Sequence, residues 1–340
     1  MLLLFIESNQ IVDVKPLAKL TNLTTLNLSK NQIQDATPLA ELRQLTTLDL
    51  SGNQIPEWEA DRLIQIIQKN RQRLNQQTNQ QTGEADRLIQ EAQQLFDRQT
   101  AASYQEALQK FDAARSLYQR VGKRQGEAYA LNQMGLISNR LGERQQALDY
   151  YKQALFQDRL LGDRPQQAIV LNNIGAVYYA LGEKQQALDY YNQVLSLIRE
   201  MSDRPKEATI LNISPSTHTS PGDRPAEATT LNNIGLVYND LGEKQKAREY
   251  FNQALTLFRA MGDRTREATT LNNIGLVYND LGEKQTALDY YNQALRLRGE
   301  VRDRSREATT LNNIGKVYSD LGEQQKALEY YNQSLPLTRA

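Results

Sequence analysis

Few residue types in this 340-residue chain are suited to catalysis or metal binding. The chain has no cysteine and one histidine, His218, which excludes thiolate or histidine metal clusters and a cysteine nucleophile. His218 lies in a segment rich in proline and serine, with no acid–base partner near it in the sequence. The sequence shows no phosphate-binding glycine loop and no zinc-protease or hydrolase signature. We therefore expect a non-enzymatic protein without a cofactor or a metal ion.

Asparagine is the residue type whose spacing favours ligand binding. The pattern Leu-Asn-Asn-Ile-Gly, once in the form Leu-Asn-Gln-Met-Gly, recurs mostly every 40 residues, beginning at Leu131, Leu171, Leu231, Leu271 and Leu311. An asparagine amide offers both a donor and an acceptor, which suits the backbone of an extended peptide. Each such hydrogen bond contributes about 1 kcal/mol, so a row of several could hold a peptide.

The surrounding residues predict that each pattern lies on the first of two packed helices. In the copy at 223–261, Leu231, Ile234 and Tyr238 recur at helical spacing and form a core face. Gly242 suits the left-handed position that ends a helix, and Gly235 is small enough for a close helix approach. The second helix is expected to bury Ala247, Phe251, Ala254 and Leu255.

This helix–turn–helix unit resembles the tetratricopeptide repeat family. The residues that carry the resemblance are Ile234, Gly235, Tyr238, Gly242, Ala247, Phe251 and Ala254. Leucine at the family's early tryptophan position and the 40-residue period are similar to the branch typified by kinesin light chain and the Leu-Gly-Asn scaffolds. The resemblance implies a mostly all-α fold, a right-handed α-solenoid whose first helices line a concave groove. It also implies that groove asparagines bind peptide backbone.

The predicted groove is the face of each first helix opposite its core face. A protein or peptide is the expected ligand of this face. The predicted partner-binding residues are Asn132, Asn172, Asn232, Asn239, Asp240, Asn272, Asn279, Asp280, Asn312, Lys316 and Asp320. The alternative is that the copies are recent duplications, so that their identity reflects ancestry rather than binding.

A different repeat occupies the N-terminal 57 residues. Leu23-Thr-Thr-Leu-Asn-Leu-Ser-Lys-Asn31 recurs 22 residues later, starting at Leu45, and the same register reaches back to Leu4. This segment resembles the leucine-rich repeat family, which implies a small α/β segment of about two and a half repeats with one short strand each. The helical stretch after Pro56, including Trp58, is expected to close the end of this segment.

Composition shifts predict the domain organisation. We expect a leucine-rich segment at 1–57, a helix and Gln-rich linker at 58–83, tetratricopeptide blocks at 84–213 and 223–340, and a Pro/Ser hinge at 214–222. The first block ends in a truncated repeat, 203–213. Alternatively, this irregularity is a tolerated deletion without a regulatory role.

Charge and hydropathy narrow the expected partners. Forty basic and forty acidic residues give a formal net charge of zero, which makes nucleic acid an unlikely partner. No apolar run is long enough to cross a membrane, so a cytoplasmic protein is expected. The last repeat leaves Leu328, Tyr331 and Leu335 uncovered, which favours self-association.

Two further functions stay open. Bacterial arrays with similar copies often lead into a caspase-like CHAT protease domain, so the chain could be a detached sensor or regulatory arm of a signalling or protease system with a separately encoded effector. An RNA-binding helical-repeat protein is the weaker alternative, because acidic side chains recur on the predicted groove.

Overall fold

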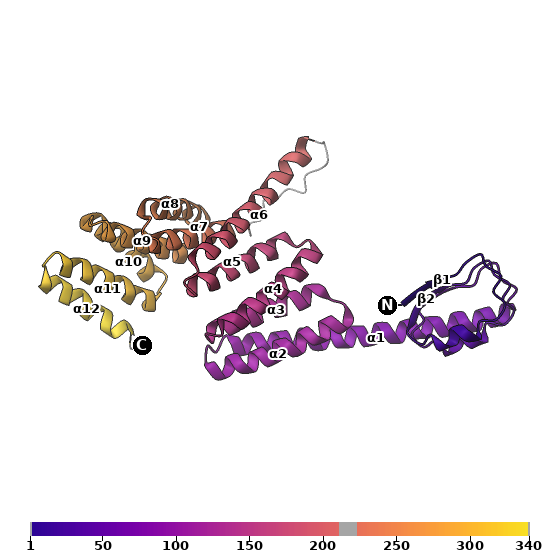
Figure 1. Ribbon diagram of the computed structural model, residues 1–340. Coiled ribbons are helices and arrows are strands. Elements are labelled where there is room, and N and C mark those ends of the chain that lie inside the picture. Colours follow the sequence, from indigo (N-terminus) through magenta and orange to yellow (C-terminus); the bar gives the residue numbers. More distant parts are fainter. Residues whose placement is uncertain (1, 211–222, 339–340) are drawn as a thin grey trace. The chain divides into compact units, whose positions relative to one another are not determined.

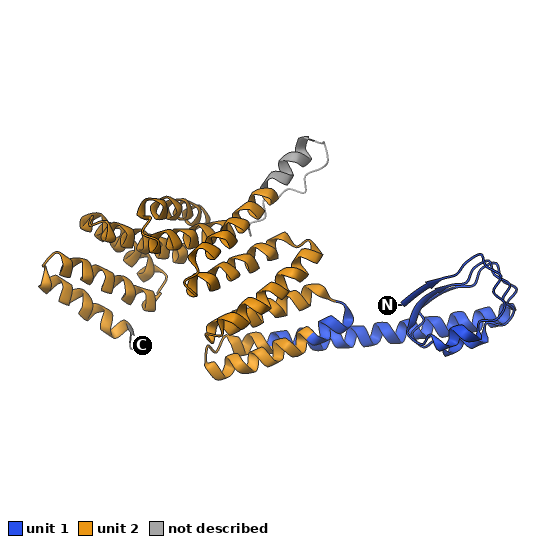
Figure 2. Ribbon diagram, viewed as in Figure 1, with its two compact units in different colours: residues 1–90, 116–122 blue, residues 91–115, 123–340 orange. Residues whose placement is uncertain are grey.

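The computed structural model describes residues 2–210 and 223–338, and its contacts divide the chain into two compact units (Figure 2). Unit 1 comprises residues 1–90 and 116–122, and unit 2 comprises residues 91–115 and 123–340.

Unit 1 contains the predicted leucine-rich repeats. Its sheet has three parallel strands in the order β1 (Leu2–Phe5), β2 (Leu23–Asn27) and β3 (Thr47–Asp49). Each strand is followed by a return segment, and two of these contain the 3₁₀ helices η1 (Lys15–Lys19) and η2 (Thr37–Glu41). Leu4 pairs with Leu26 and Leu26 with Leu48, so the register of the sheet equals the 22-residue period of the sequence.

Asparagine side chains hold the turns of unit 1 together. The Asn31 amide donates to the carbonyl oxygens of Ile6 and Leu28 at 3.0 and 2.9 Å, and its Oδ1 accepts from the backbone N–H of Ile11. Asn53 repeats this arrangement one turn later. The turns leave backbone groups that no strand pairs, and the asparagines satisfy them.

The first helix closes the leucine-rich core. Helix α1 (Glu57–Phe96) buries Leu63 and Ile67 against a cluster that includes Leu26, Leu28 and Leu45. Aliphatic side chains on one face of the helix therefore continue the core that the strands begin. The tryptophan singled out in the sequence does not take part, because its side chain is 63% exposed.

Within the predicted helix and Gln-rich linker at 58–83, the Gln-rich residues 75–82 are helical, so the linker part of that prediction is wrong. These residues lie inside α1, which runs without a break through the whole of 58–83. Glutamine has a good intrinsic helix propensity, and the segment contains no proline. Low complexity therefore does not mean a disordered spacer here.

Unit 2 is an α-solenoid of helix–turn–helix repeats (Figure 1). Helix α2 (Ala101–Val121) packs on the last turns of α1, and Lys110 pairs there with Glu91 at 2.5 Å. The repeats that follow are α3 (Arg124–Arg140) with α4 (Arg144–Leu161), α5 (Arg164–Ala180) with α6 (Lys184–Ile210), α7 (Asp223–Asp240) with α8 (Lys244–Met261), α9 (Arg264–Asp280) with α10 (Lys284–Glu300), and α11 (Arg304–Asp320) with α12 (Gln324–Thr338).

Each repeat has the core that the sequence predicts. In the repeat of α7 and α8, Leu231, Ile234 and Phe251 are buried, and Tyr238 stacks on Tyr250 with ring centroids 5.4 Å apart. The glycine at the turn, Gly242, has a φ of +80° and ends α7 as expected. The second tyrosine of each Tyr-Tyr pair in α4, α6 and α10 is 1% exposed, so these rings belong to the core.

The half-length repeat does not divide unit 2. Helix α6 continues as far as Ile210, and the solenoid resumes with α7. Ala187 and Tyr191 of α6 share a buried cluster with Ile234 and Val237 of α7, so these two helices stack directly within unit 2. The predicted hinge, 214–222, lies outside the described residues.

The extension of α6 has a cause in the sequence. Gly162 and Gly262 end helices α4 and α8 in the left-handed conformation, with φ of +68° and +69°. The corresponding residue of α6 is Ser202, which lies inside the helix. The glycine that favours the helix stop is missing here, and the first residues of the truncated repeat extend α6, although Arg302 after α10 shows that a residue with a Cβ can also take the left-handed position.

Arg302 occupies this same left-handed position after α10, with a φ of +57°. The left-handed conformation destabilises a residue with a Cβ by about 1 kcal/mol. We therefore expect Arg302→Gly to raise the free energy of unfolding by about 1 kcal/mol. Arg296→Gly, in the exposed interior of α10, is the control and should lower it by a similar amount. Urea denaturation of both variants measures the difference. A destabilised Arg302→Gly variant would contradict this assignment.

Candidate functional site

The first helices of unit 2 border an open hollow of about 500 Å³. It is lined by Thr229 and Asn232 of α7, Thr269 of α9 and Arg306 of α11, with Phe258 of α8 among the lining residues. The hollow therefore spans three consecutive repeats on the face where the sequence predicts a groove. We call this face, which includes the corresponding positions of α3 and α5, the groove.

The first asparagine of each repeat forms a ladder between repeats. Asn232 Oδ1 accepts from Thr270 Oγ1 and Asn273 Nδ2 of the next first helix, both at 3.2 Å. Asn272 accepts equivalent bonds from Thr310 and Asn313. The same contact joins Asn132 to Asn173, and Asn172 to Thr230 and Asn233.

This ladder crosses the sequence irregularity unchanged. Asn172 and Asn233 are 61 residues apart, whereas the regular partners Asn232 and Asn273 are 41 apart, yet both pairs have Nδ2–Oδ1 distances of 3.2 Å. Neighbouring first helices thus keep one geometry whatever the length of chain between them. The last asparagine, Asn312, accepts instead from Ser334 Oγ of α12 at 2.7 Å.

Most of the predicted residues at the ends of the first helices bind lysines rather than facing the hollow. Lys244 Nζ donates to Asn239 Oδ1 at 2.8 Å and to Asp280 Oδ2 at 2.5 Å. Lys284 repeats this arrangement with Asn279 and Asp320.

Between the repeat of α5 and α6 and the repeat of α7 and α8, Asp240 makes the corresponding contacts. Its Oδ2 accepts from Tyr179 at 2.6 Å, and its backbone oxygen accepts from Lys184. Lys316 is exposed. The structure thus brings together two sets of predicted residues, the ladder and these lysine contacts, and both join one repeat to the next.

A buried position with a variable side chain escaped the sequence analysis. Near the ends of α4, α6, α8 and α10, the same repeat position holds Asp158, Ile198, Phe258 and Arg298, and each is 2–3% exposed. An alignment of the second-helix sequences would have shown this position, because two of these repeats have a charged residue where the other two have an apolar one. Two charges are thus buried at a position that otherwise belongs to the core.

The two buried charges differ in how they are satisfied. The Arg298 guanidinium donates to the backbone oxygen of Arg306 and to Thr310 Oγ1, and burial lowers its pKa to about 10. No hydrogen bond or ion pair among the described residues reaches the Asp158 carboxylate. Burial, and secondly the charge of Asp163, raise the pKa of Asp158 to about 7.

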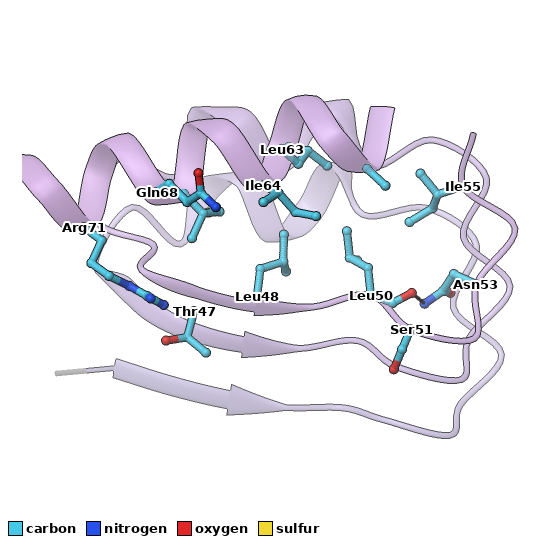
Figure 3. A pocket seen from close by; sticks show the side chains of 12 residues that line it. Thr47, Leu48, Leu50, Ser51, Asn53, Ile55, Leu63, Ile64, Gln68 and Arg71 are labelled. Carbon is cyan, nitrogen blue, oxygen red and sulfur yellow. Dashed lines mark hydrogen bonds between the residues drawn. The ribbon is translucent and has the colours of Figure 1, made fainter. Parts of the chain in front are cut away.

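Unit 1 contains a separate apolar cavity of about 440 Å³ between β3 and α1 (Figure 3). Leu48, Leu50, Leu63 and Ile64 point into it, and Arg71 lies at one end, where its Nη2 donates to the Thr46 carbonyl oxygen at 2.7 Å. The cavity lies beside the last strand of the sheet, so the helix covers this end of the leucine-rich core incompletely.

The surface of α12, candidate metal sites and membrane spans are the remaining features that the sequence analysis considered. Leu328 and Leu335 of α12 are 53% and 50% exposed, and self-association through this face stays a prediction. Within residues 2–210 and 223–338, no cluster of three or more His, Cys, Asp or Glu side chains could hold a metal ion. None of the described helices is both long and apolar enough to span a membrane.

Comparison with known proteins identifies both kinds of repeat. A family model described as Tetratricopeptide repeat matches residues 155–200, 219–260 and 266–340, and one described as Leucine Rich repeats (2 copies) matches residues 2–41 and 21–60. No curated protein matches the sequence.

Solved structures share the solenoid fold at low sequence identity. The apo form of RapI is 16% identical over 75% of this chain and 98% of that chain, with a TM-score of 0.53. A Rap protein complexed with Competence and Sporulation Factor is 15% identical over 77% of both chains, with a TM-score of 0.52. The structure of pilF from Pseudomonas aeruginosa is 17% identical over 74% of this chain and 91% of that chain, with a TM-score of 0.50. The chain is thus a tetratricopeptide repeat protein with an N-terminal leucine-rich repeat segment.

Proposed function

We propose that the chain is a non-enzymatic scaffold that binds an extended peptide, or an exposed segment of a partner protein, in the groove of unit 2. The observation that carries this proposal is the hollow of about 500 Å³ that crosses α7, α9 and α11. A solenoid offers a continuous surface of this kind because each repeat contacts only its neighbours. A Rap protein of similar fold is complexed with Competence and Sporulation Factor, which supports a binding role for such a surface.

The ladder asparagines contribute to this function mainly through the scaffold. Their side-chain oxygens already accept hydrogen bonds from the next repeat, so they keep the first helices in register. A ligand would contact other side chains that line the hollow, such as Thr269 and Arg306. Replacing the asparagines would disturb stacking and binding together, and would not isolate the groove.

A bulky side chain at Thr269 tests the groove directly. Thr269 lines the hollow, and its hydroxyl bonds only within its own helix, to the Thr265 carbonyl oxygen. Peptides are first selected on the wild-type protein from a random dodecapeptide library. Thr269→Trp fills the hollow without removing a contact between repeats, and we expect it to weaken these peptides at least tenfold in fluorescence anisotropy.

Thr256→Trp is the matched control. Thr256 lies on the exposed face of α8, and its hydroxyl also bonds within its own helix, to the Asn252 carbonyl oxygen. This variant should bind the selected peptides as the wild type does. Equal affinities for the wild type and Thr269→Trp, with unchanged circular dichroism, would rule out this hollow as the binding site.

A further inference from the structure

A small cavity with a buried acid lies where the repeat of α3 and α4 meets α5. The cavity, of about 80 Å³, is lined by Gln125, Ala128, Tyr129, Asn132, Asp158 and Gln166. Gln125, Tyr129 and Gln166 are exposed, whereas Asp158 is 3% exposed. The carboxylate thus lies at the buried side of a hollow whose rim meets solvent.

This cavity is the counterpart of the hollow near Phe258, two repeats further on. Tyr129, Asn132 and Asp158 hold the repeat positions of Thr229, Asn232 and Phe258. The same place in the groove therefore has an acidic floor in one repeat and an aromatic floor in another. A ligand lying along the groove would meet different chemistry at each.

No group among residues 2–210 and 223–338 compensates the charge of Asp158. The rim position that holds Arg266 beside Phe258 holds Gln166 here. Asp163, the N-cap of α5, adds a second negative charge nearby. Burying an acid without a partner is costly, and an incoming cation would remove that cost.

We propose that Asp158 forms the floor of a subsite for a cationic group, the side chain of a lysine or arginine in the peptide bound by the groove. This inference rests on the proposed function and names the chemistry of its ligand. The cation would pair with the carboxylate, donate to the glutamine side-chain oxygens at the rim, and lie beside the Tyr129 ring, which is 41% exposed. A cavity of about 80 Å³ has room for an ammonium or guanidinium group.

Selection from the random dodecapeptide library at pH 8 tests the subsite. The full chain is used as wild type, as Asp158→Ile, and as the matched control Asp189→Asn, which changes an exposed acid on α6. Isoleucine is suited to the site because Ile198 holds the same position in the next repeat. We expect the wild type and the control to enrich peptides with lysine or arginine at one fixed position. Asp158→Ile should lose that preference.

A synthetic peptide from the wild-type selection gives the quantitative comparison. Replacing its fixed lysine or arginine by norleucine should weaken binding to the wild type at least tenfold and change binding to Asp158→Ile less than twofold. If both proteins enrich the same peptides, or if no fixed cation is found, the subsite is overturned while the groove stands. If neither protein enriches peptides, the proposed function fails, and the subsite fails with it.

Discussion

Gly235→Ala should destabilise the solenoid by about 1 kcal/mol, although alanine is the better helix former. A Cβ at this position of α7 would lie 2.7 Å from Cδ1 and Cε1 of Phe251, which is fully buried in α8. Such an overlap forces either the ring or the backbone to move, and overpacking of this kind costs about 1–3 kcal/mol. The gain in helix propensity, about 0.5–1 kcal/mol, offsets only part of this cost. Urea denaturation measures the difference.

The same substitution at Gly83 should have the opposite sign. Gly83 lies inside α1, and no atom comes within 4 Å of a Cβ built there. Gly83→Ala should therefore stabilise α1 by about 0.5–1 kcal/mol. When Phe251 is replaced by leucine, the smaller side chain should relieve the overlap, so that Gly235→Ala costs less in the Phe251→Leu background than in the wild type. A stabilising Gly235→Ala would show that the two helices do not need the glycine.

The close approach of the paired helices was predictable, but its partner was not. Helical spacing indicates that Gly235 faces the second helix, and Ala247 looks like the complementary small residue. The structure instead places the Phe251 ring against the glycine, while Ala247 is buried in the same core cluster as Phe251 without being the residue that meets the glycine. Spacing along one helix identifies a face, whereas the partner depends on how the two helices are offset along their axes.

The roles of the groove asparagines were less predictable for a related reason. Helical periodicity correctly separates Asn232 from the core face, since it lines the hollow. Periodicity within one helix contains no information about the next first helix, whose Thr270 and Asn273 bond to Asn232. The amide that suits a peptide backbone also suits a neighbouring side chain. Contacts between repeats therefore need the stacking geometry, which a single helix does not supply.

The Gln-rich segment and the truncated repeat show two further limits of composition. Glutamine-rich sequence predicted a linker at 75–82, but helix propensity decides the conformation there. A lost half-repeat predicted two blocks, but Tyr191 and Ile234 pack as regular neighbours across it. A stacking interface depends on the faces that meet, and the length of the intervening chain affects it only through a slowly growing loop entropy.

Asp158→Asn should make unit 2 more stable at pH 8 and change it much less at pH 5. The raised pKa of Asp158, about 7, means that the folded chain binds a proton that the unfolded chain has already lost above pH 4. Between these values the folded state carries more protons, so wild-type stability falls as the pH rises from about 4 to 7. Three pKa units correspond to up to about 4 kcal/mol at pH 8, and the neutral amide avoids this loss.

The comparison of Asp158→Asn with the wild type needs a control at an acidic residue that is exposed to solvent. Asp189→Asn, on the exposed face of α6, should change the free energy of unfolding by less than about 0.5 kcal/mol at both pH values. Urea denaturation of both variants at pH 5 and pH 8 gives the result. An Asp158→Asn variant with the same advantage at both pH values would show that the carboxylate does not titrate in this range. Because a bound cation would stabilise the ionised carboxylate, the acid that costs stability in the free protein is the group that a cationic ligand would satisfy.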